Sequence, residues 1–194
     1  MKYLYANIND YNDKDYKFIY ESINNFKKKD IDKLPTNDDK KRSVLGIKLL
    51  MNLLSEKSIN YNDLRFTKNK DGKPIITNYS LFYSTSHSDE YVICAISDKE
   101  IGIDIQSIQE INFKIMNSFF NEDEKLYSNN NENYTKILSL KEAYGKCYGF
   151  GINHIKEVKF SIKEKNIIIN DTSVSYKFIN DIPNYIISIV EKTY

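Results

Sequence analysis

Residues 100–108 read EIGIDIQSI, an isoleucine-rich stretch in which Gly102, Asp104 and Gln106 occupy every second position. Successive side chains of a β-strand point to opposite faces, so the isoleucines share one face and these three residues share the other. The apolar face predicts burial in a core. The opposite face carries a carboxylate and an amide, which predicts a polar site on the same strand.

The chain on the N-terminal side of this strand predicts an α+β pattern. Strand patterns cover residues 1–8, 80–86, 91–97 and 101–106, and helix patterns cover residues 13–29 and 38–57. Asn37 or Asp38 is the expected N-cap of the second helix. Because only the turn-like SDKE separates the strands 91–97 and 101–106, we expect these two strands to form a hairpin.

The C-terminal side repeats this order of elements. Helix patterns cover residues 112–128 and 134–148 with an Asn-rich loop between them, and strand patterns follow at 154–162, 165–170, 174–179 and 185–192. Helices followed by strands thus occur twice, which favours two similar α+β halves. We assign these halves to residues 1–99 and 100–194.

Composition limits the function without defining it. The chain has 194 residues, of which 41% are hydrophobic, enough for a substantial core. A formal net charge of +1 gives no support for a nucleic acid or membrane partner. The sequence has no apolar run of about 18 residues and no typical signal peptide, so we expect a cytoplasmic protein. Cys94 and Cys147 lie outside any CxxC pair and predict buried free thiols.

A second chemical stretch, LSLKEAYGKCYGFG, covers residues 138–151. On a helix, Ser139, Glu142 and Lys146 form one stripe that combines a hydroxyl, a carboxylate and an ammonium group. An exposed ion pair between Glu142 and Lys146 is the alternative interpretation, and this stretch alone does not decide between a site and a solvated face.

Phosphate-binding groups are suggested at two further places. STSHS at 84–88 supplies hydroxyl groups and an imidazole, and DGKP supplies Lys73 a short way upstream. A structural histidine at a strand end is the alternative for His87. Lys41 and Arg42 follow the start of the long helix, where cations oppose the helix dipole, so an anionic ligand is as good an explanation as a solvated face.

The order of these motifs resembles the 4′-phosphopantetheinyl transferases, and within them the monomeric Sfp-type (surfactin-type) class. The resemblance covers about residues 40–152 and rests on Arg42, GKP at 72–74, SHS at 86–88, GIDIQ at 102–106, FFNEDE at 119–124 and SLKEAYGK at 139–146. It implies two pseudo-symmetric α+β halves, each a small antiparallel sheet packed on a long helix. Coenzyme A and Mg²⁺ would bind in a cleft between the halves.

The implied activity moves the phosphopantetheine arm of coenzyme A onto a serine of an apo acyl, peptidyl or polyketide carrier protein and releases 3′,5′-ADP. Such carriers belong to fatty acid, nonribosomal peptide or polyketide biosynthesis. By the resemblance, Asp104 and Glu142 are metal ligands, Glu142 is also the candidate base, and Lys146 stabilises the leaving group.

The resemblance also assigns the phosphate-binding residues. Lys73, Ser86 and His87 match residues that bind the phosphates of coenzyme A, and Arg42 matches a residue at its nucleotide end. We add Lys41 and Ser139 as further cofactor-binding candidates.

Two positions depart from the family pattern. Gln106 stands where the family commonly has Glu, and its carbonyl oxygen remains a candidate metal ligand. Leu138 stands where the family has Trp. These departures leave open a coenzyme A binding protein without transfer activity, and an unrelated Mg²⁺-dependent nucleotide enzyme is a third hypothesis.

The expected carrier surface lies after the GIDIQ strand. Apolar side chains and two lysines are its candidates: Ile111, Phe113, Ile115, Met116, Lys114 and Lys125. The inner face of an ordinary helix is the alternative for the apolar residues.

Overall fold

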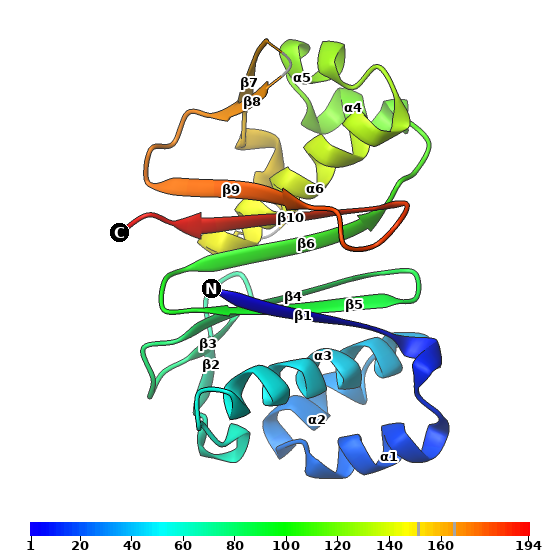
Figure 1. Ribbon diagram of the computed structural model, residues 1–194, viewed down its shortest axis with the longest axis vertical. Coiled ribbons are helices and arrows are strands. Elements are labelled where there is room, and N and C mark those ends of the chain that lie inside the picture. Colours follow the sequence, from blue (N-terminus) through cyan, green and yellow to red (C-terminus); the bar gives the residue numbers. More distant parts are fainter. Residues whose placement is uncertain (151, 165) are drawn as a thin grey trace.

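Two three-stranded antiparallel sheets form the centre of the molecule, with helices on either side of the pair (Figure 1). The structure is a computed structural model that describes residues 1–150, 152–164 and 166–194. The first sheet has the order β1-β5-β4 and the second the order β6-β10-β9. Their strands are β1 (Lys2–Asn7), β4 (Phe82–Ser88), β5 (Tyr91–Ser97), β6 (Ile101–Ser107), β9 (Val174–Ile179) and β10 (Tyr185–Lys192).

The N-terminal helices lie against the first sheet. They are α1 (Asp13–Ser22), α2 (Asn25–Ile31) and α3 (Asn37–Ser55). The prediction of one helix over 13–29 is wrong, because Ile23 is extended and Asn24 caps a new helix. The predicted cap of the long helix is also wrong: the hydroxyl group of Thr36 accepts from the amide of Asp39 at 3.0 Å.

The C-terminal helices lie on the other side of the sheets (Figure 1). They are α4 (Phe113–Phe119), α5 (Glu122–Tyr127) and α6 (Asn131–Tyr148). The single helix predicted over 112–128 is two helices, because Asn121 and Glu124 form a capping box that starts α5. Part of the predicted Asn-rich loop is helical, since Asn130 caps α6.

Within the described ranges, two short hairpins and three 3₁₀ helices complete the fold. The hairpins are β2 (Phe66–Lys68) with β3 (Pro74–Ile76) and β7 (Phe160–Lys163) with β8 (Asn166–Ile169). The 3₁₀ helices are η1 (Ile8–Asp10), η2 (Tyr61–Asp63) and η3 (Ile152–Glu157). The strand predicted over 154–162 is therefore largely wrong, because β7 begins only at Phe160.

The predicted hairpin between β5 and β6 is wrong. β5 pairs with β1 and β4, whereas β6 pairs with β10 from the C-terminal end of the chain. The SDKE connection instead carries the chain from one sheet to the other. Ile93 and Ala95 of β5 consequently pack with the isoleucines of β6 in a core that both sheets share.

The order of elements occurs twice along the chain. Apart from the 3₁₀ helices, the described part of each half has a strand, three α-helices, a short hairpin and two further strands in this order. The two sheet orders correspond strand by strand. This repeat confirms the predicted fold of two pseudo-symmetric α+β halves with small antiparallel sheets. The independence of residues 1–99 and 100–194 as domains stays a prediction.

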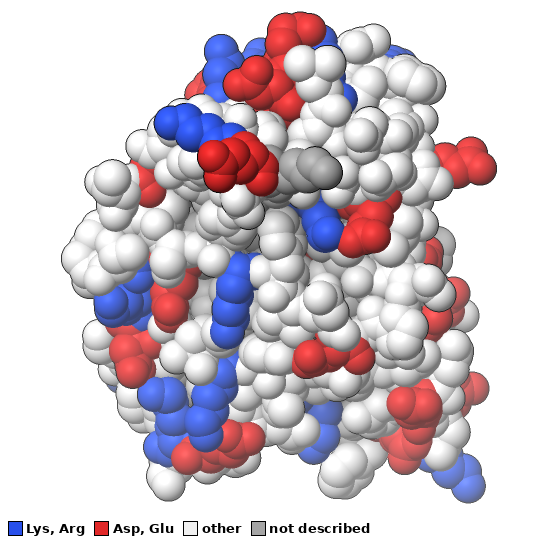
Figure 2. All heavy atoms as spheres, turned by 45° about the horizontal axis from the view of Figure 1, so that its top comes forward, with Lys and Arg blue, Asp and Glu red and all other residues white. Residues whose placement is uncertain are grey.

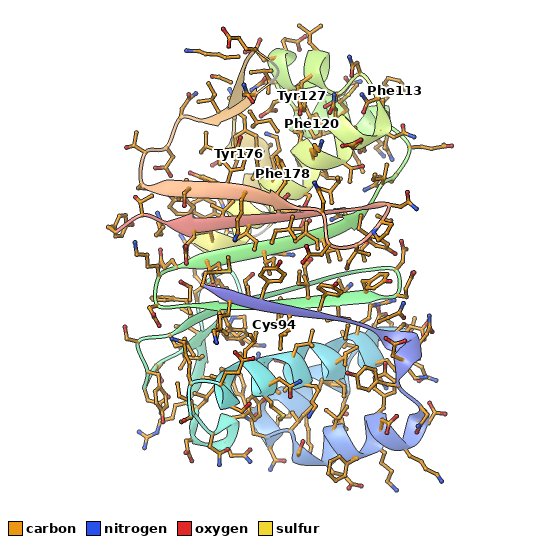
Figure 3. All side chains as sticks on the ribbon, viewed as in Figure 1. Cys94, Phe113, Phe120, Tyr127, Tyr176 and Phe178 are labelled. Carbon is orange, nitrogen blue, oxygen red and sulfur yellow. The ribbon has the colours of Figure 1, made fainter. Side chains whose placement is uncertain are left out.

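Both faces of β6 are buried from Ile101 to Ile105, and the predicted burial of its isoleucines is confirmed. Ile101, Ile103 and Ile105 are fully buried on one face of β6. Cys94 of β5 lies in the core on the α3 side of the first sheet (Figure 3). Cys94 and Cys147 are both free and buried, as predicted.

The surface is mixed in charge. Positive and negative side chains are interspersed on the face drawn in Figure 2. Among the helices that the structure describes, none is long and apolar enough to span a membrane.

Candidate active site

Helix α6 lies directly on strand β6 because Gly102 has no side chain. A Cβ atom at this position would lie 1.9 Å from the carbonyl oxygen of Ala143 and 2.4 Å from the amide nitrogen of Cys147. No side chain fits into this space. The glycine thus allows the polar face of β6 and the predicted stripe of α6 to meet.

Serine hydroxyl groups join strand β4 of the first half to strand β6 of the second. Ser84 Oγ accepts from the amide of Ile103 at 3.1 Å. Ser88 Oγ accepts from the amide of Ser107 at 3.0 Å. These contacts fix the alignment of the two strands, and Ser86 between them points at Asp104.

Asp104 is the centre of a buried hydrogen-bond network. The residue is only 1% exposed. Its Oδ1 accepts from Ser86 Oγ at 2.7 Å and from Lys146 Nζ at 2.7 Å. Lys146 also donates to Ser86 Oγ at 2.7 Å. Three of the predicted site residues, from three distant motifs, are therefore in direct contact.

Gln106 belongs to the same network. Its Nε2 donates to Asp104 Oδ2 at 3.1 Å. In this orientation the amide nitrogen faces the carboxylate. Direct metal ligation by Gln106 would require the amide to turn, so this part of the assignment stays a prediction.

Glu142 lies within electrostatic reach of Asp104. Its pKa is raised, first by burial and then by the negative charge of Asp104, while Lys146 acts in the opposite direction. Two carboxylates with an ammonium group beside them thus share one region. The resemblance assigned Asp104 and Glu142 to one metal site, and this assignment stays a prediction.

A cavity of about 270 Å³ lies among α2, α3 and β4 and borders this network. Arg42, Ser86 and His87, which are candidates for phosphate binding, line it. Arg42 donates to Asp39 Oδ1 at 2.7 Å and to the carbonyl oxygen of Asp89 at 3.0 Å. Its Nε is buried without a partner among the described residues.

Two further basic side chains, His87 and Lys27, have pKa values that this environment lowers. The pKa of His87 is lowered, first by displacement of solvent from the ring and then by Arg42 and Lys146. Lys27, which the sequence analysis did not identify, also lines the cavity and donates to the hydroxyl group of Tyr83 at 3.0 Å. Burial lowers the pKa of Lys27 to about 8. In the sequence, nothing distinguishes Lys27 from the neighbouring lysines of FKKKD.

A second cavity of about 260 Å³ adjoins the first. The two share Pro74, Tyr83 and Thr85 as lining residues. Lys146 lines the second cavity and Ser86 lines the first, so their contact lies at the boundary. A ligand extended through both cavities would pass the Asp104 network.

Three other predicted residues lie differently from the expectation. Lys73 lines the second cavity, but its ammonium group donates to the carbonyl oxygens of Lys146 and Cys147 at the end of α6. Lys41 forms an ion pair of 3.1 Å with Asp13 of α1 and does not line either cavity. Ser139 is fully buried, lines neither cavity, and has no partner for its hydroxyl group within the described residues.

The FFNEDE motif has a structural role that explains Glu124. Glu124 and Lys141 form an ion pair of 3.0 Å with both side chains 0% exposed. Glu124 also accepts from the amides of Phe160 and Asn121, at 2.7 and 2.8 Å. The pair therefore joins α5, α6 and β7. Lys141, directly before Glu142, is a residue whose role the sequence analysis missed.

The chain matches two sequence profiles from one family. The profile described as "4'-phosphopantetheinyl transferase, N-terminal" matches residues 10–99. The profile described as "4'-phosphopantetheinyl transferase superfamily" matches residues 100–190. Together the two profiles extend over both halves of the fold.

Curated relatives carry the same name. The chain is 36% identical over 121 residues to 4′-phosphopantetheinyl transferase gsp of Aneurinibacillus migulanus, covering 59% of this chain and 51% of that protein. It is 30% identical over 124 residues to 4′-phosphopantetheinyl transferase Sfp of Bacillus subtilis (strain 168), covering 60% and 55%. The chain thus spans about half the length of the curated relatives it matches. With both profiles and these relatives in agreement, the chain belongs to the 4′-phosphopantetheinyl transferase superfamily and is similar to its Sfp-type members.

Proposed function

We propose that this protein transfers the 4′-phosphopantetheine arm of coenzyme A to a serine hydroxyl group of an apo carrier protein and releases 3′,5′-ADP. The observation that carries the proposal is the contact of Asp104, Ser86 and Lys146 beside Glu142. These residues come from the SHS, GIDIQ and SLKEAYGK motifs. They adjoin two neighbouring cavities that share three lining residues, which supports a ligand as long as coenzyme A.

The chemistry of the reaction requires a particular set of groups. The serine oxygen forms a bond to the phosphorus atom that carries pantetheine, and the bond from this phosphorus to the bridging oxygen of the diphosphate breaks. The serine proton goes to a base, and the leaving phosphate of 3′,5′-ADP keeps the electron pair. Such a step depends on positioning and on neutralising negative charge at the phosphates.

Glu142 is our candidate for the base. Burial and the charge of Asp104 raise its pKa, which strengthens its affinity for a proton. Lys146 is our candidate for the cation that stabilises the leaving phosphate, because its side chain borders the second cavity. A cation at this point lowers the energy of the negative charge that develops on the leaving oxygen.

The donor set fits Mg²⁺, the metal that the family implies. No group of three or more His, Cys, Asp or Glu side chains in the described ranges has metal-binding geometry. Mg²⁺ usually takes only one or two carboxylates and completes its shell with phosphate oxygens and waters, so Asp104 and Glu142 would suffice. When bound, the ion would neutralise phosphate charge.

A further buried group supports this fit. Ser188 on β10 lies opposite Asp104 in the β6–β10 pairing, and its hydroxyl group is buried without a partner among the described residues. A hydrated cation beside Asp104 would supply polar contacts in this region. Gln106 would contribute its carbonyl oxygen only after the amide turns.

The phosphates at the nucleotide end of coenzyme A would bind in the first cavity. Lys27, Arg42 and His87 line it, and the unpartnered Nε of Arg42 is a donor available to an anion. Asp30 and Asp39 line the same cavity and limit its positive charge. We retain Lys73 as a cofactor-binding candidate through its position in the second cavity, and we give Lys41 and Ser139 no part in the binding.

The carrier protein would dock near α4. Phe113 at the start of this helix is 66% exposed and lies at the surface (Figure 3). Ile115 and Met116 are partly buried beside the exposed Lys114. An apolar contact with a lysine at its edge would suit a carrier helix that presents apolar and acidic side chains.

A mass measurement tests the proposal directly. The protein is incubated with Mg²⁺, coenzyme A and a panel of apo carrier proteins, and a carrier should gain the mass of one phosphopantetheine arm. Glu142→Gln should abolish this gain, whereas Glu132→Gln, at an exposed position of the same helix, should retain it. Coenzyme A binding without a mass gain on any carrier would instead indicate a binding protein.

A further inference from the structure

Both carboxylate oxygens of Asp104 already accept hydrogen bonds. Oδ1 receives Ser86 and Lys146, each at 2.7 Å, and Oδ2 receives Gln106 at 3.1 Å. With Asp104 at 1% exposure, water contributes little to its solvation. A buried carboxylate needs a compensating positive charge, and Lys146 supplies it.

The two ends of this ion pair differ in their surroundings. The Asp104 side chain is 1% exposed, whereas that of Lys146 is 30% exposed and borders the second cavity. Lysine carries its charge on a flexible four-carbon chain. The ammonium group can therefore turn toward the cavity while α6 and β6 keep their places.

A divalent cation that binds Asp104 would compete with this ammonium group. Two positive charges at the same oxygen repel each other, and the repulsion is strong where water is excluded. Entry of the cation thus requires Lys146 to find another anionic partner. The diphosphate of coenzyme A would provide one in the adjoining cavity.

We propose that Lys146 is the resident counter-ion of Asp104 and exchanges places with the divalent cation when the diphosphate binds. This inference rests on the proposed function and adds a coupling that the function alone does not require. Free cation binds weakly, and cation and coenzyme A strengthen each other's binding by the same factor.

Mn²⁺ binding to the full chain, followed by electron paramagnetic resonance without coenzyme A, tests the exchange. Lys146→Met should raise the Mn²⁺ affinity by about 10-fold, within the range of couplings between interacting sites. Lys146→Arg should stay near the wild-type affinity because it keeps the charge. Lys146→Gln repeats the test if the methionine variant does not fold.

Two matched controls separate contact from net charge. Lys136→Met removes a lysine that is paired with Glu132 at the surface of the same helix, and should leave the Mn²⁺ affinity unchanged. Lys73→Met removes a nearby charge that contacts main-chain carbonyl groups. Its effect should be clearly smaller than that of Lys146→Met, and equal effects would overturn the inference.

Addition of coenzyme A completes the test. It should raise the Mn²⁺ affinity of the wild type by a larger factor than that of Lys146→Met. An unchanged Mn²⁺ affinity in Lys146→Met, or no Mn²⁺ binding to any chain, overturns the inference. Carrier modification by the wild type is assayed separately. If the wild type transfers the arm but shows no coupling between Mn²⁺ and coenzyme A binding, the exchange is refuted and the proposed function is retained.

Discussion

The two halves of the molecule use the same topology for different purposes. Strands β1 and β6 hold equivalent positions in the two sheets. On the side that faces its helix, β1 carries Leu4 and Ala6, which pack into the first core. On the equivalent side, β6 carries Gly102 and Asp104. The first half thus fills this helix–sheet interface with apolar side chains, and the second half places the candidate site residue Asp104 there.

The helices make the same contrast. In α3, a Cβ atom at Gly46 would lie 3.6 Å from Val92 Cγ1, an ordinary contact. At Gly102, a Cβ atom would collide with the main chain of α6. The main-chain contact between β6 and α6 at Gly102 accompanies the Asp104–Lys146 ion pair. The two glycines therefore differ in whether their surroundings leave room for a side chain.

Removal of the Asp104 charge should have the largest effect. Asp104→Asn keeps the size of the side chain but removes the partner of Lys146 and the proposed metal carboxylate. We expect the transfer rate to fall by about 10³-fold, as for loss of a central electrostatic group. Carrier mass analysis measures the rate. Asp98→Asn, at an exposed acid in the connection that leads from one sheet to the other, should retain the transfer rate. An active Asp104→Asn would exclude the metal assignment.

Replacing Gly102 or Gly46 by alanine adds one methyl group and tests the difference between the two glycines. Gly102→Ala should lower the free energy of unfolding by about 3 kcal/mol, because the main chains of β6 and α6 must separate. Gly46→Ala should leave it unchanged or raise it by up to about 1 kcal/mol, since alanine favours the helix. Urea denaturation measures both. Equal effects would show that the close approach of α6 is not required.

The pH profile of the rate tests the role of Glu142. Its raised pKa means that protonation, which removes the base, begins at a higher pH than for an ordinary glutamate with a pKa of about 4.3. The rate should fall about tenfold per pH unit below this raised pKa. Single-turnover rates between mildly acidic and neutral pH would reveal it. A profile that falls only near the ordinary value would argue against Glu142 as the base.

The junction of the halves depends on serine hydroxyl groups. Ser84→Ala leaves the amide of Ile103 without its acceptor and should cost about 1 to 2 kcal/mol of unfolding free energy. Ser80→Ala, at an exposed position before β4, should have no measurable effect. Thermal denaturation compares the two. A neutral Ser84→Ala would mean that the apolar core between the sheets aligns the strands without the hydroxyl group.

The titration of Lys27 should have the smallest effect on ligand binding. Burial lowers the pKa of Lys27 to about 8, the positive charge of Lys68 lowers it further, and the negative charge of Asp30 acts in the opposite direction. Lys27 is charged below this pH and neutral above it, so 3′,5′-ADP should bind about threefold more weakly at pH 9 than at pH 7. Calorimetry measures the change. In Lys27→Met the change should be smaller, and an identical pH dependence in this variant would place its origin elsewhere.

Strand β6 and helix α6 were predictable because their signals are local. The alternation in residues 100–108 predicted both faces of β6, and the spacing of Ser139, Glu142 and Lys146 predicted a shared helix side. Of these three residues, only Glu142 and Lys146 lie near Asp104. The spacing along a helix does not tell which of its turns borders a cavity.

Other features depend on contacts that the sequence does not record. The short connection after β5 is typical of a hairpin, but β6 takes its partner from the C-terminus. Ser84 and Ser88 resemble phosphate ligands in the sequence, yet they bind amides of β6, since a hydroxyl group suits both partners. Lys27 becomes distinct from its neighbours only in the folded chain, where it lines the first cavity and contacts Tyr83.

The serine contacts between β4 and β6 have a consequence for how the protein loses activity. Ser86 is supplied by one half and Asp104 by the other, so neither half contains the proposed active site alone. A small slip between the halves would separate these groups while every helix and strand stayed folded. On warming, turnover should accordingly decrease at a lower temperature than the circular dichroism signal does. The loss of turnover would then report the separation of the two halves.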